Sequence, residues 1–307
     1  MNDYDVIVLG GGAPGEHCAA ALAARGLRVA VVERELVGGE CSYWACIPSK
    51  SLLRPGEAVR AALDVGATAQ VDVAAALAWR DYMVSNWSDA GQQSWLASRG
   101  IDLLRGTGKL AGTGVVEVEG VRHAAAHVVV ATGADPVVPP VPGLRELEGV
   151  WPLTHVGEYE GDVVAGNIAG DPRPANYEAV PRVTYTDPQA AAVGALEAPY
   201  SGTAKLSEVP KTATYTHAWA QSNGFLTLLS DGERLTGAYA LGPEAGEWLQ
   251  QATLAIRAHV PLDVLSDTIQ PFPSFSGIYD AAVMDLRMKI ADMPPPRRPM
   301  DAQMAGF

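Results

Sequence analysis

The stretch that decides the fold of this 307-residue chain is GGECSYWACIPSK, residues 38–50. It contains two cysteines, Cys41 and Cys46, with four residues between them, and Pro48 follows the second. Proline fits the first turn of a helix because it has no N–H to lose there. We therefore expect a helix to begin at Cys46, where the helix dipole and unpaired N–H groups favour the thiolate. The stretch predicts a redox-active cysteine pair.

Two other interpretations of the cysteines were weighed, a metal site and two inert buried thiols. Zinc would need further ligands at close spacing, and none of the six histidines supplies them. The third cysteine, Cys18, falls in a predicted helix, where we expect it to be a small buried hydrophobe.

A glycine-rich loop lies nearer the start of the chain. The apolar run Val6–Leu9 predicts a buried parallel strand. A GxGxxG pattern follows this strand directly, with its glycines at Gly10, Gly12 and Gly15. A helix is then expected over residues 16–25.

The elements around this loop have the spacing of a dinucleotide-binding unit. A second strand is expected over Leu27–Val32, and Glu33 ends it. In such units the glycines let the backbone approach a pyrophosphate, and the helix start offers N–H groups to it. The terminal acid accepts hydrogen bonds from a ribose. The pattern predicts dinucleotide binding, and the alternative is a glycine-rich turn without a ligand.

The cysteine stretch, the glycine loop and Ala131-Thr132-Gly133 together resemble the class I flavoprotein disulfide reductases. That family includes dihydrolipoamide dehydrogenase, glutathione reductase and mercuric reductase. The resemblance implies an α/β fold, with an FAD-binding Rossmann-like domain on a doubly wound parallel sheet and an α+β C-terminal dimerisation domain. It also implies that Cys41 reacts with substrate while Cys46 lies against the flavin. The residues it assigns to FAD are Gly10, Gly12, Gly15, Glu33, Gly39, Lys50, Thr132 and Gly133.

The resemblance divides the chain into three parts. We expect the FAD-binding domain over residues 1–179, the dimerisation domain over 180–290 and a disordered tail over 291–307. Long helices are predicted over 73–98 and 245–259, and the aromatic residues of the first are expected to serve in packing. The family works as a homodimer, so we expect one here.

The nicotinamide-binding domain of the family is missing. Seventeen residues separate Gly133 from Trp151, whereas a βαβ unit needs about 30. The NAD(P)H domain is therefore expected to be absent between about residues 143 and 151, and with it the partner that Lys50 has in the relatives. The family's Gly-Asp strand is also gone. Either another segment, with 148–151 as the candidate, fills its place in the sheet, or FAD is held loosely.

The family's acid–base pair is missing as well. Phe272 stands where its histidine would be and Gly277 where its glutamate would be, and neither can carry a proton. Bulky residues, Tyr43 and Trp44, stand between the cysteines. With Phe272 and Phe275 they form a predicted apolar pocket for a small organic substrate.

Charge and composition indicate which kinds of partner and which compartment to expect. The net charge of −13 argues against nucleic acid, which needs a clustered basic surface. No apolar run reaches the roughly 20 residues that cross a bilayer, and the start of the chain does not resemble a signal peptide. Three cysteines do not make a structural disulfide framework, so the cytoplasm is expected.

The sequence therefore predicts an FAD-dependent oxidoreductase with a redox-active Cys41–Cys46 disulfide that works without its own NAD(P)H domain. Its reaction would be thiol oxidation or the flavin-dependent oxidation of a small molecule. The alternative is a non-catalytic protein, either a natural remnant or an engineered deletion, that forms a dimer with or without flavin.

Overall fold

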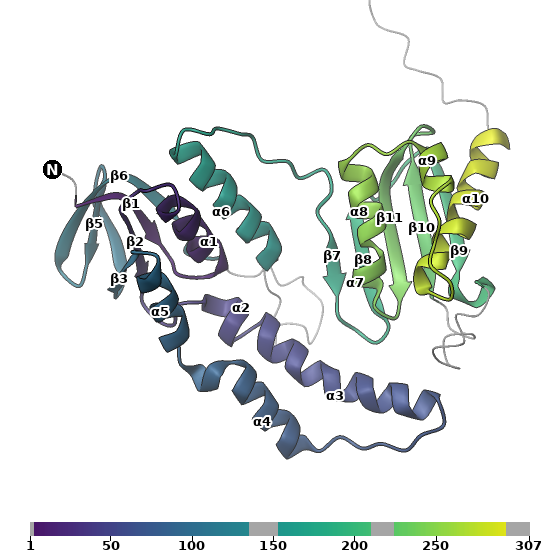
Figure 1. Ribbon diagram of the computed structural model, residues 1–307, viewed down its shortest axis with the longest axis horizontal. Coiled ribbons are helices and arrows are strands. Elements are labelled where there is room, and N and C mark those ends of the chain that lie inside the picture. Colours follow the sequence, from purple (N-terminus) through teal and green to yellow (C-terminus); the bar gives the residue numbers. More distant parts are fainter. Residues whose placement is uncertain (1–2, 135–152, 210–223, 293–307) are drawn as a thin grey trace, which may run out of the picture. The chain divides into compact units, whose positions relative to one another are not determined.

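The computed structural model describes residues 3–134, 153–209 and 224–292 (Figure 1). The chain divides into two compact units, which are described separately. The first comprises residues 1–56 and 70–175, and the second comprises 57–69 and 176–307.

A six-stranded sheet forms the centre of the first unit, in the order β3-β2-β1-β6-β5-β4. Its strands are β1 (Tyr4–Leu9), β2 (Val29–Glu33), β3 (Asp102–Arg105), β4 (Gly108–Gly112), β5 (Val115–Val118) and β6 (Val121–Val130). Strands β3, β2, β1 and β6 are parallel, whereas β5 and β4 extend the sheet in antiparallel fashion. The predicted α/β fold is confirmed.

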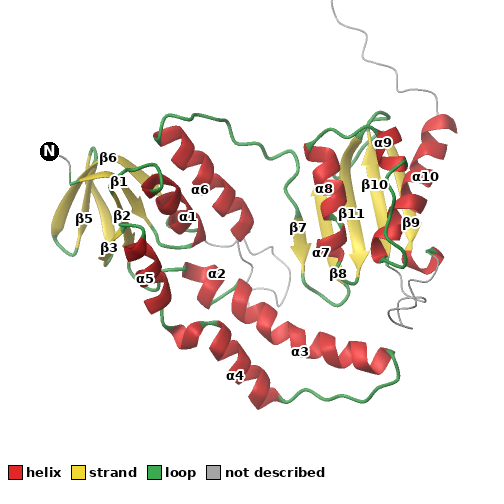
Figure 2. Cartoon of the chain, viewed as in Figure 1, coloured by secondary structure: helices red, strands yellow, loops and turns green. Residues whose placement is uncertain are grey.

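Both faces of the central strand are covered. Val6 and Val8 of β1 pack in one apolar cluster and Ile7 packs in another, as expected for a parallel strand buried on both sides. Helices α1 (Ala13–Ala23) and α6 (Thr154–Ile168) lie together beside this sheet (Figure 2). Cys18 of α1 is buried in the first cluster, as predicted.

Two glycines let α6 approach α1 closely. A Cβ atom at Gly157 would lie 2.4 Å from Cγ of Pro14, and one at Gly161 would lie 2.6 Å from the Pro14 carbonyl oxygen. No larger residue fits either position without moving a helix. The close contact fixes the start of α6 relative to the glycine-rich loop that precedes α1.

The segment between β2 and β3 is helical but interrupted. It forms α2 (Gly39–Tyr43), α3 (Cys46–Asp64), α4 (Val73–Met83), the short 3₁₀ helix η1 (Ser85–Trp87) and α5 (Ala90–Ser98). The single helix predicted over 73–98 is wrong. Ser85, Asn86 and Trp87 all have positive φ angles, which an α-helix of L-residues cannot accommodate. Trp79, Tyr82 and Trp87 are exposed, although the Trp79 and Tyr82 rings stack and Arg80 lies over the Trp87 ring.

The sequence predicts a missing strand in this sheet, and the pairing of β6 shows where an edge is left open among the described residues. Strand β1 pairs with residues 125–130 of β6, and β5 pairs only with 121–124. Among the residues that the structure describes, no strand lies against the other side of 125–130. The segment expected to fill this place, 148–151, lies outside the described residues.

The second unit is an antiparallel sheet of five strands in the order β7-β8-β11-β10-β9. The strands are β7 (Arg182–Thr184), β8 (Gln189–Gly194), β9 (Tyr200–Lys205), β10 (Phe225–Ser230) and β11 (Leu235–Gly242). The helices are η2 (Leu206–Glu208), α7 (Ala245–Trp248), α8 (Gln250–Arg257), α9 (Leu262–Ser266), η5 (Phe275–Gly277) and α10 (Ile278–Asp292). The predicted β10–β11 hairpin is confirmed, whereas the single helix expected over 245–259 is divided at Leu249.

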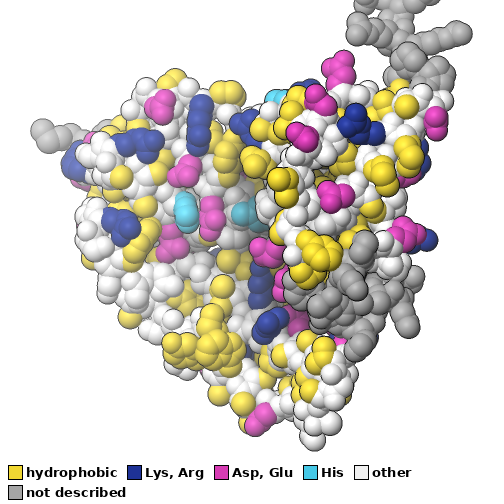
Figure 3. Space-filling view, turned by 45° about the vertical axis from the view of Figure 1, so that its right-hand side comes forward, with side chains coloured by type: hydrophobic (Ala, Val, Ile, Leu, Met, Phe, Trp, Pro, Cys, Tyr) yellow, Lys and Arg dark blue, Asp and Glu magenta, His cyan; other side chains and the backbone are white. Residues whose placement is uncertain are grey.

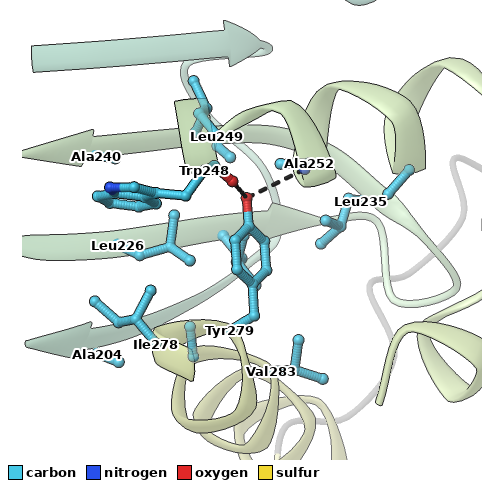
Figure 4. Close-up of a cluster of buried hydrophobic side chains, with 14 of the residues drawn as sticks. Ala204, Leu226, Leu235, Ala240, Trp248, Leu249, Ala252, Ile278, Tyr279 and Val283 are labelled. Carbon is cyan, nitrogen blue, oxygen red and sulfur yellow. Dashed lines mark hydrogen bonds between the residues drawn. The ribbon is translucent and has the colours of Figure 1, made fainter. Parts of the chain in front are cut away.

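Tyr279 is the central residue of the second unit's core (Figure 4). It points from α10 towards α7 and α8, and its hydroxyl donates a hydrogen bond to the Trp248 carbonyl at 3.0 Å. The same oxygen accepts a hydrogen bond from the Ala252 amide at 3.1 Å. This buried hydroxyl is therefore satisfied by the backbone of two helices.

The described surface carries mixed charge. The face seen in Figure 3 has acidic and basic side chains interspersed among apolar ones. None of the described helices is long and apolar enough to cross a membrane. The described residues also include no cluster of three acidic, histidine or cysteine side chains that could hold a metal ion.

Candidate active site

The three glycines of the first loop have different structural roles. A Cβ at Gly10 would lie 2.1 Å from the Ala131 carbonyl oxygen, and one at Gly15 would lie 1.9 Å from the Gly10 oxygen. These two glycines let the loop pack on itself and on the end of β6, next to Thr132. A Cβ at Gly12 would meet nothing closer than 4.0 Å. The backbone at Gly12 is thus left open for the approach of a ligand.

The glycine-rich loop is joined to the cysteine stretch. The Gly38 amide donates a hydrogen bond to the Gly11 carbonyl at 2.7 Å, and Gly12 and Gly38 form a backbone bridge. A Cβ at Gly39 would lie 2.8 Å from Cα of Gly12. Helix α2, which carries Cys41, therefore begins directly against the loop.

Glu33 ends β2 beside the same loop. Its Oε2 accepts a hydrogen bond from the Gly11 amide and its Oε1 accepts one from the Glu35 amide, both at 2.7 Å. Each oxygen keeps a second lone pair that can accept from a ribose hydroxyl. The open backbone at Gly12, the start of α1 without a side-chain cap and this fixed carboxylate fit the binding of FAD.

The two cysteines come together. Cys41 lies in α2 and Cys46 is the first residue of α3, and the two thiols share a hydrogen bond. The hydrogen bond from Cys41 lowers the pKa of Cys46 to about 6, against an opposing effect of burial. The Thr154 hydroxyl and the charge of Lys50 contribute to this lowering. The Cys41 pKa is raised, first because its proton is shared with Cys46 and second because it is buried.

This asymmetry gives the cysteines different chemistry. The lowered pKa of Cys46 and the raised pKa of Cys41 favour the thiolate at Cys46 and the proton on Cys41. The position of Cys46 at the start of a 19-residue helix acts in the same direction. Lys50, one turn along α3, stabilises the anion by its charge.

Thr154 completes the sulfur site, and the sequence did not indicate it. Its Oγ1 lies 3.2 Å from Cys46 Sγ, and its hydroxyl also contacts Cys41. It is the first residue of α6, so the packing of Gly157 and Gly161 on α1 holds it there.

Asp89 holds the backbone that leads into the cysteine stretch. Its buried carboxylate accepts hydrogen bonds from the Val37 amide at 2.9 Å and from Gln93 at 2.7 Å, and it pairs with Arg105 at 2.6 Å. Arg105 also donates to the Glu35 carbonyl. This network anchors the turn that leads into Gly38, and no motif in the sequence marked it.

The four residues of the predicted aromatic pocket belong to two different units. Tyr43 is only 2% exposed, and its hydroxyl donates to the Ser88 carbonyl at 3.3 Å. Trp44 beside it is 41% exposed. Phe272 is 74% exposed in the second unit, and Phe275 packs against that unit's core. A pocket made by these four residues stays a prediction.

Comparison with known proteins shows the family to which the chain belongs. Residues 4–165 match the model of the pyridine nucleotide-disulphide oxidoreductases, and residues 180–283 match that family's dimerisation domain. The chain belongs to this family, the class I flavoprotein disulfide reductases. Its first unit has the FAD-binding fold of that family.

Individual relatives resemble part of the chain. A mercuric reductase from Lysinibacillus sphaericus is 31% identical over 48% of this chain and 28% of its own length. A dihydrolipoyl dehydrogenase from Chlamydia muridarum is 32% identical over 52% of this chain and 36% of its own length. One from Acholeplasma laidlawii is 34% identical over 47% of this chain and 45% of its own length. The matched regions thus span less than half of each of these relatives.

Proposed function

We propose that this protein is an FAD-dependent thiol oxidase in which Cys41 and Cys46 form a redox-active disulfide. The observation that carries the proposal is the unequal pair of thiols. Cys46 is stabilised as a thiolate by Thr154, Lys50 and the start of α3, whereas Cys41 retains its proton. A dithiol with one good leaving group and one protonated partner is suited to disulfide exchange.

The exchange has two steps. A substrate thiolate attacks Cys41 Sγ, the Cys41–Cys46 bond breaks, and Cys46 leaves as the thiolate. A second substrate thiolate then attacks the substrate sulfur of the mixed disulfide and releases Cys41, which takes up a proton. The substrate dithiol has become a disulfide, the protein disulfide has become a dithiol, and the second substrate proton goes to solvent.

The residues that would hold FAD are those of the glycine-rich loop, with the Gly12 backbone at the pyrophosphate and Glu33 at the ribose. FAD held there would supply a two-electron acceptor for the reduced cysteine pair, with oxygen or another electron acceptor as the final oxidant. Because Gly133 and Trp151 leave no room for a nicotinamide domain, we propose that thiols and not NAD(P)H are the electron donors.

Oxygen consumption tests this function. The purified protein, supplied with dithiothreitol as donor, is expected to consume oxygen with catalytic turnover, and NADH or NADPH is expected to give none. Cys41→Ser should abolish the dithiothreitol-driven rate, while Cys18→Ser serves as the matched control because that cysteine lies in the core. Turnover with NADH would contradict the proposed electron donor.

Two other outcomes separate the remaining functions. Flavin reduction by a small organic molecule that survives Cys41→Ser would favour oxidation at the aromatic pocket. A colourless protein that forms a dimer would favour the non-catalytic alternative. The dimerisation domain supports the proposal that the protein works as a homodimer.

A further inference from the structure

Helix α4 exposes its apolar side chains and shields its charged ones. Its sequence is VAAALAWRDYM, and none of these residues is buried. Val73, Trp79 and Tyr82 are each more than half exposed, whereas the side chain of Arg80 is only 24% exposed. A surface helix normally turns its apolar residues inward and its charged residues outward. The arrangement in α4 is the reverse, which indicates that something else covers this helix.

The 3₁₀ helix η1 adds a third aromatic ring to the same surface. Trp87 is exposed, and the Arg80 guanidinium lies 5.2 Å from the centre of its ring. The Trp79 and Tyr82 rings stack with their centres 5.4 Å apart. We call the exposed apolar residues of α4 and η1 the aromatic face: Val73, Leu77, Trp79, Tyr82, Met83 and Trp87.

The aromatic face is held on a fixed support. Asp72 caps the start of α4 by accepting a hydrogen bond from the Ala75 amide at 3.0 Å. Val84, at the other end of the helix, is buried, and the Asp89 network anchors the chain two residues beyond Trp87. A surface that is already ordered loses little conformational entropy when a partner binds.

The area of the aromatic face suits a protein interface. A fully covered aromatic side chain buries about 150–250 Å². Three rings that are each about half exposed therefore present roughly 300 Å², and the aliphatic residues enlarge this area. A stable dimer buries about 800 Å² on each partner. The face would form a substantial part of such an interface, and Trp, Tyr and Arg are the residues that most often carry its binding energy.

The charges of α4 favour a second copy of the chain over a membrane or a charged partner. Arg80 pairs with Asp81 at 2.6 Å, so their charges cancel within the helix. Helices that lie on membranes are rich in Lys and Arg, and α4 has no excess of either. Because the net charge of the chain is −13, two copies repel each other except where a neutral surface lets them meet.

We propose that a second copy of this chain covers the aromatic face, so that the first unit contributes to the homodimer in addition to the dimerisation domain. The segment that follows η1 is joined to the cysteine stretch, because the Ser88 carbonyl accepts the hydrogen bond of the Tyr43 hydroxyl. The interface is therefore built on the backbone that supports Cys41. The inference goes beyond the proposed function and does not depend on thiol oxidation.

Sedimentation velocity of the full chain, measured over a dilution series, tests the interface. Leu77→Glu and Tyr82→Glu each place a negative charge in the aromatic face and should raise the Kd of the dimer at least about tenfold. Leu110→Glu makes the same change at an exposed residue of β4 and should leave the Kd unchanged. Far-UV circular dichroism of each variant confirms that it is folded.

Labelling of an introduced cysteine tests whether a second copy covers the face. The background is the full chain with its three cysteines replaced by serine, and Ala75→Cys places a thiol one turn before Trp79. Its reaction with N-ethylmaleimide at about 100 times the Kd should be at least about tenfold slower than below the Kd. Ala97→Cys, at an exposed residue of α5, is the matched control and should react equally fast at both concentrations.

Several results would overturn the inference. Equal dissociation constants in Tyr82→Glu and Leu110→Glu would remove the aromatic face from the dimer. Labelling of Ala75→Cys that is slow both above and below the Kd would show that the chain covers the face itself. Labelling that slows only when phosphatidylglycerol vesicles are added would assign the face to a membrane. Neither experiment involves turnover, so a lack of oxygen consumption would contradict the proposed function and leave this inference intact.

Discussion

The Thr154 hydroxyl lies 3.2 Å from the Cys46 sulfur, although the two residues are 108 positions apart in the chain. The contact joins the start of α6 to the start of α3. It exists because Gly157 and Gly161 allow α6 to lie directly against α1. The chemistry of the cysteines therefore depends on how two helices pack.

Removing the Thr154 hydroxyl should weaken the Cys46 thiolate. A hydrogen bond to a charged group contributes about 1.5–3 kcal/mol, and about 1.4 kcal/mol corresponds to one pKa unit. We expect Thr154→Val to raise the pKa of Cys46 from about 6 by roughly one unit or more. The absorbance of the thiolate at 240 nm, followed against pH in the reduced protein, measures this. Thr154→Ser keeps the hydroxyl and should titrate like the wild type, so a shift of similar size in both variants would argue against the contact.

The reduced protein should become more stable as pH rises above 6. The pKa of Cys46 is lower in the folded protein than the ordinary thiol value of 9.0. Its contribution to the free energy of unfolding is therefore complete above about pH 9 and is lost as pH falls through about 6. The raised pKa of Cys41 has the opposite sign, and its contribution is lost only above pH 9. Urea unfolding of the reduced protein between pH 6 and 9 should show this slope, and Cys46→Ser should flatten it. An unchanged slope in that variant would contradict the assignment.

The Asp89 network should control the stability of the first unit. Burial acts to raise the pKa of Asp89, but hydrogen bonds from Val37, Arg105 and Gln93 outweigh it, so the pKa is lowered. Asp89→Asn breaks the pairing with Arg105 and should reduce the free energy of unfolding by about 1–3 kcal/mol at pH 7. Asp81, which is half-buried and pairs with Arg80 outside this network, is a control whose replacement by Asn should cost less than about 1 kcal/mol.

The effect of Asp89→Asn on the free energy of unfolding should also depend on pH. Because the pKa of Asp89 is lowered on folding, its contribution is present above the ordinary value of 3.8 and is lost as pH falls through the lower, folded value. The difference in stability between the wild type and Asp89→Asn should therefore shrink in acid. Urea unfolding from pH 7 down to pH 3 measures it, and a difference that stays constant would show that the carboxylate charge is not responsible.

The glycines of α6 offer a test of helix packing. Gly161→Ala places a Cβ 2.6 Å from the Pro14 carbonyl oxygen and should destabilise the protein by about 1–3 kcal/mol. It should also raise the pKa of Cys46, because α6 carries Thr154. Gly91 of α5 has no atom within 4 Å of the added Cβ, so Gly91→Ala should be neutral or stabilising by up to about 1 kcal/mol. Equal effects of the two substitutions would contradict the packing described here.

The parts of the fold that the sequence predicted are those with strong local signals. The run Val6–Leu9, the glycines behind it and the acid Glu33 specify strand, loop, helix and strand by spacing alone. The helix that begins at Cys46 was similarly indicated by Pro48. These signals are local because each element's apolar pattern and end residues lie within it.

The parts that were missed depend on tertiary contacts. Residues 73–98 look like one helix, but three consecutive residues with positive φ at 85–87 break it. Thr154 and Asp89 act through residues far away in the chain, and neither stands in a motif. The exposure of the aromatic face likewise depends on which side chains the rest of the chain covers. Such features can be found only from the packed structure.

Anaerobic titration of the purified protein with dithiothreitol tests the central claim most directly. If the protein carries FAD beside a working Cys41–Cys46 pair, the flavin absorbance near 450 nm should bleach as dithiol is added, and Cys41→Ser should bind FAD equally but resist bleaching. Two results would contradict the account. One is flavin absorbance that bleaches at the same rate in Cys41→Ser as in the wild type, and the other is a protein that binds no FAD at all.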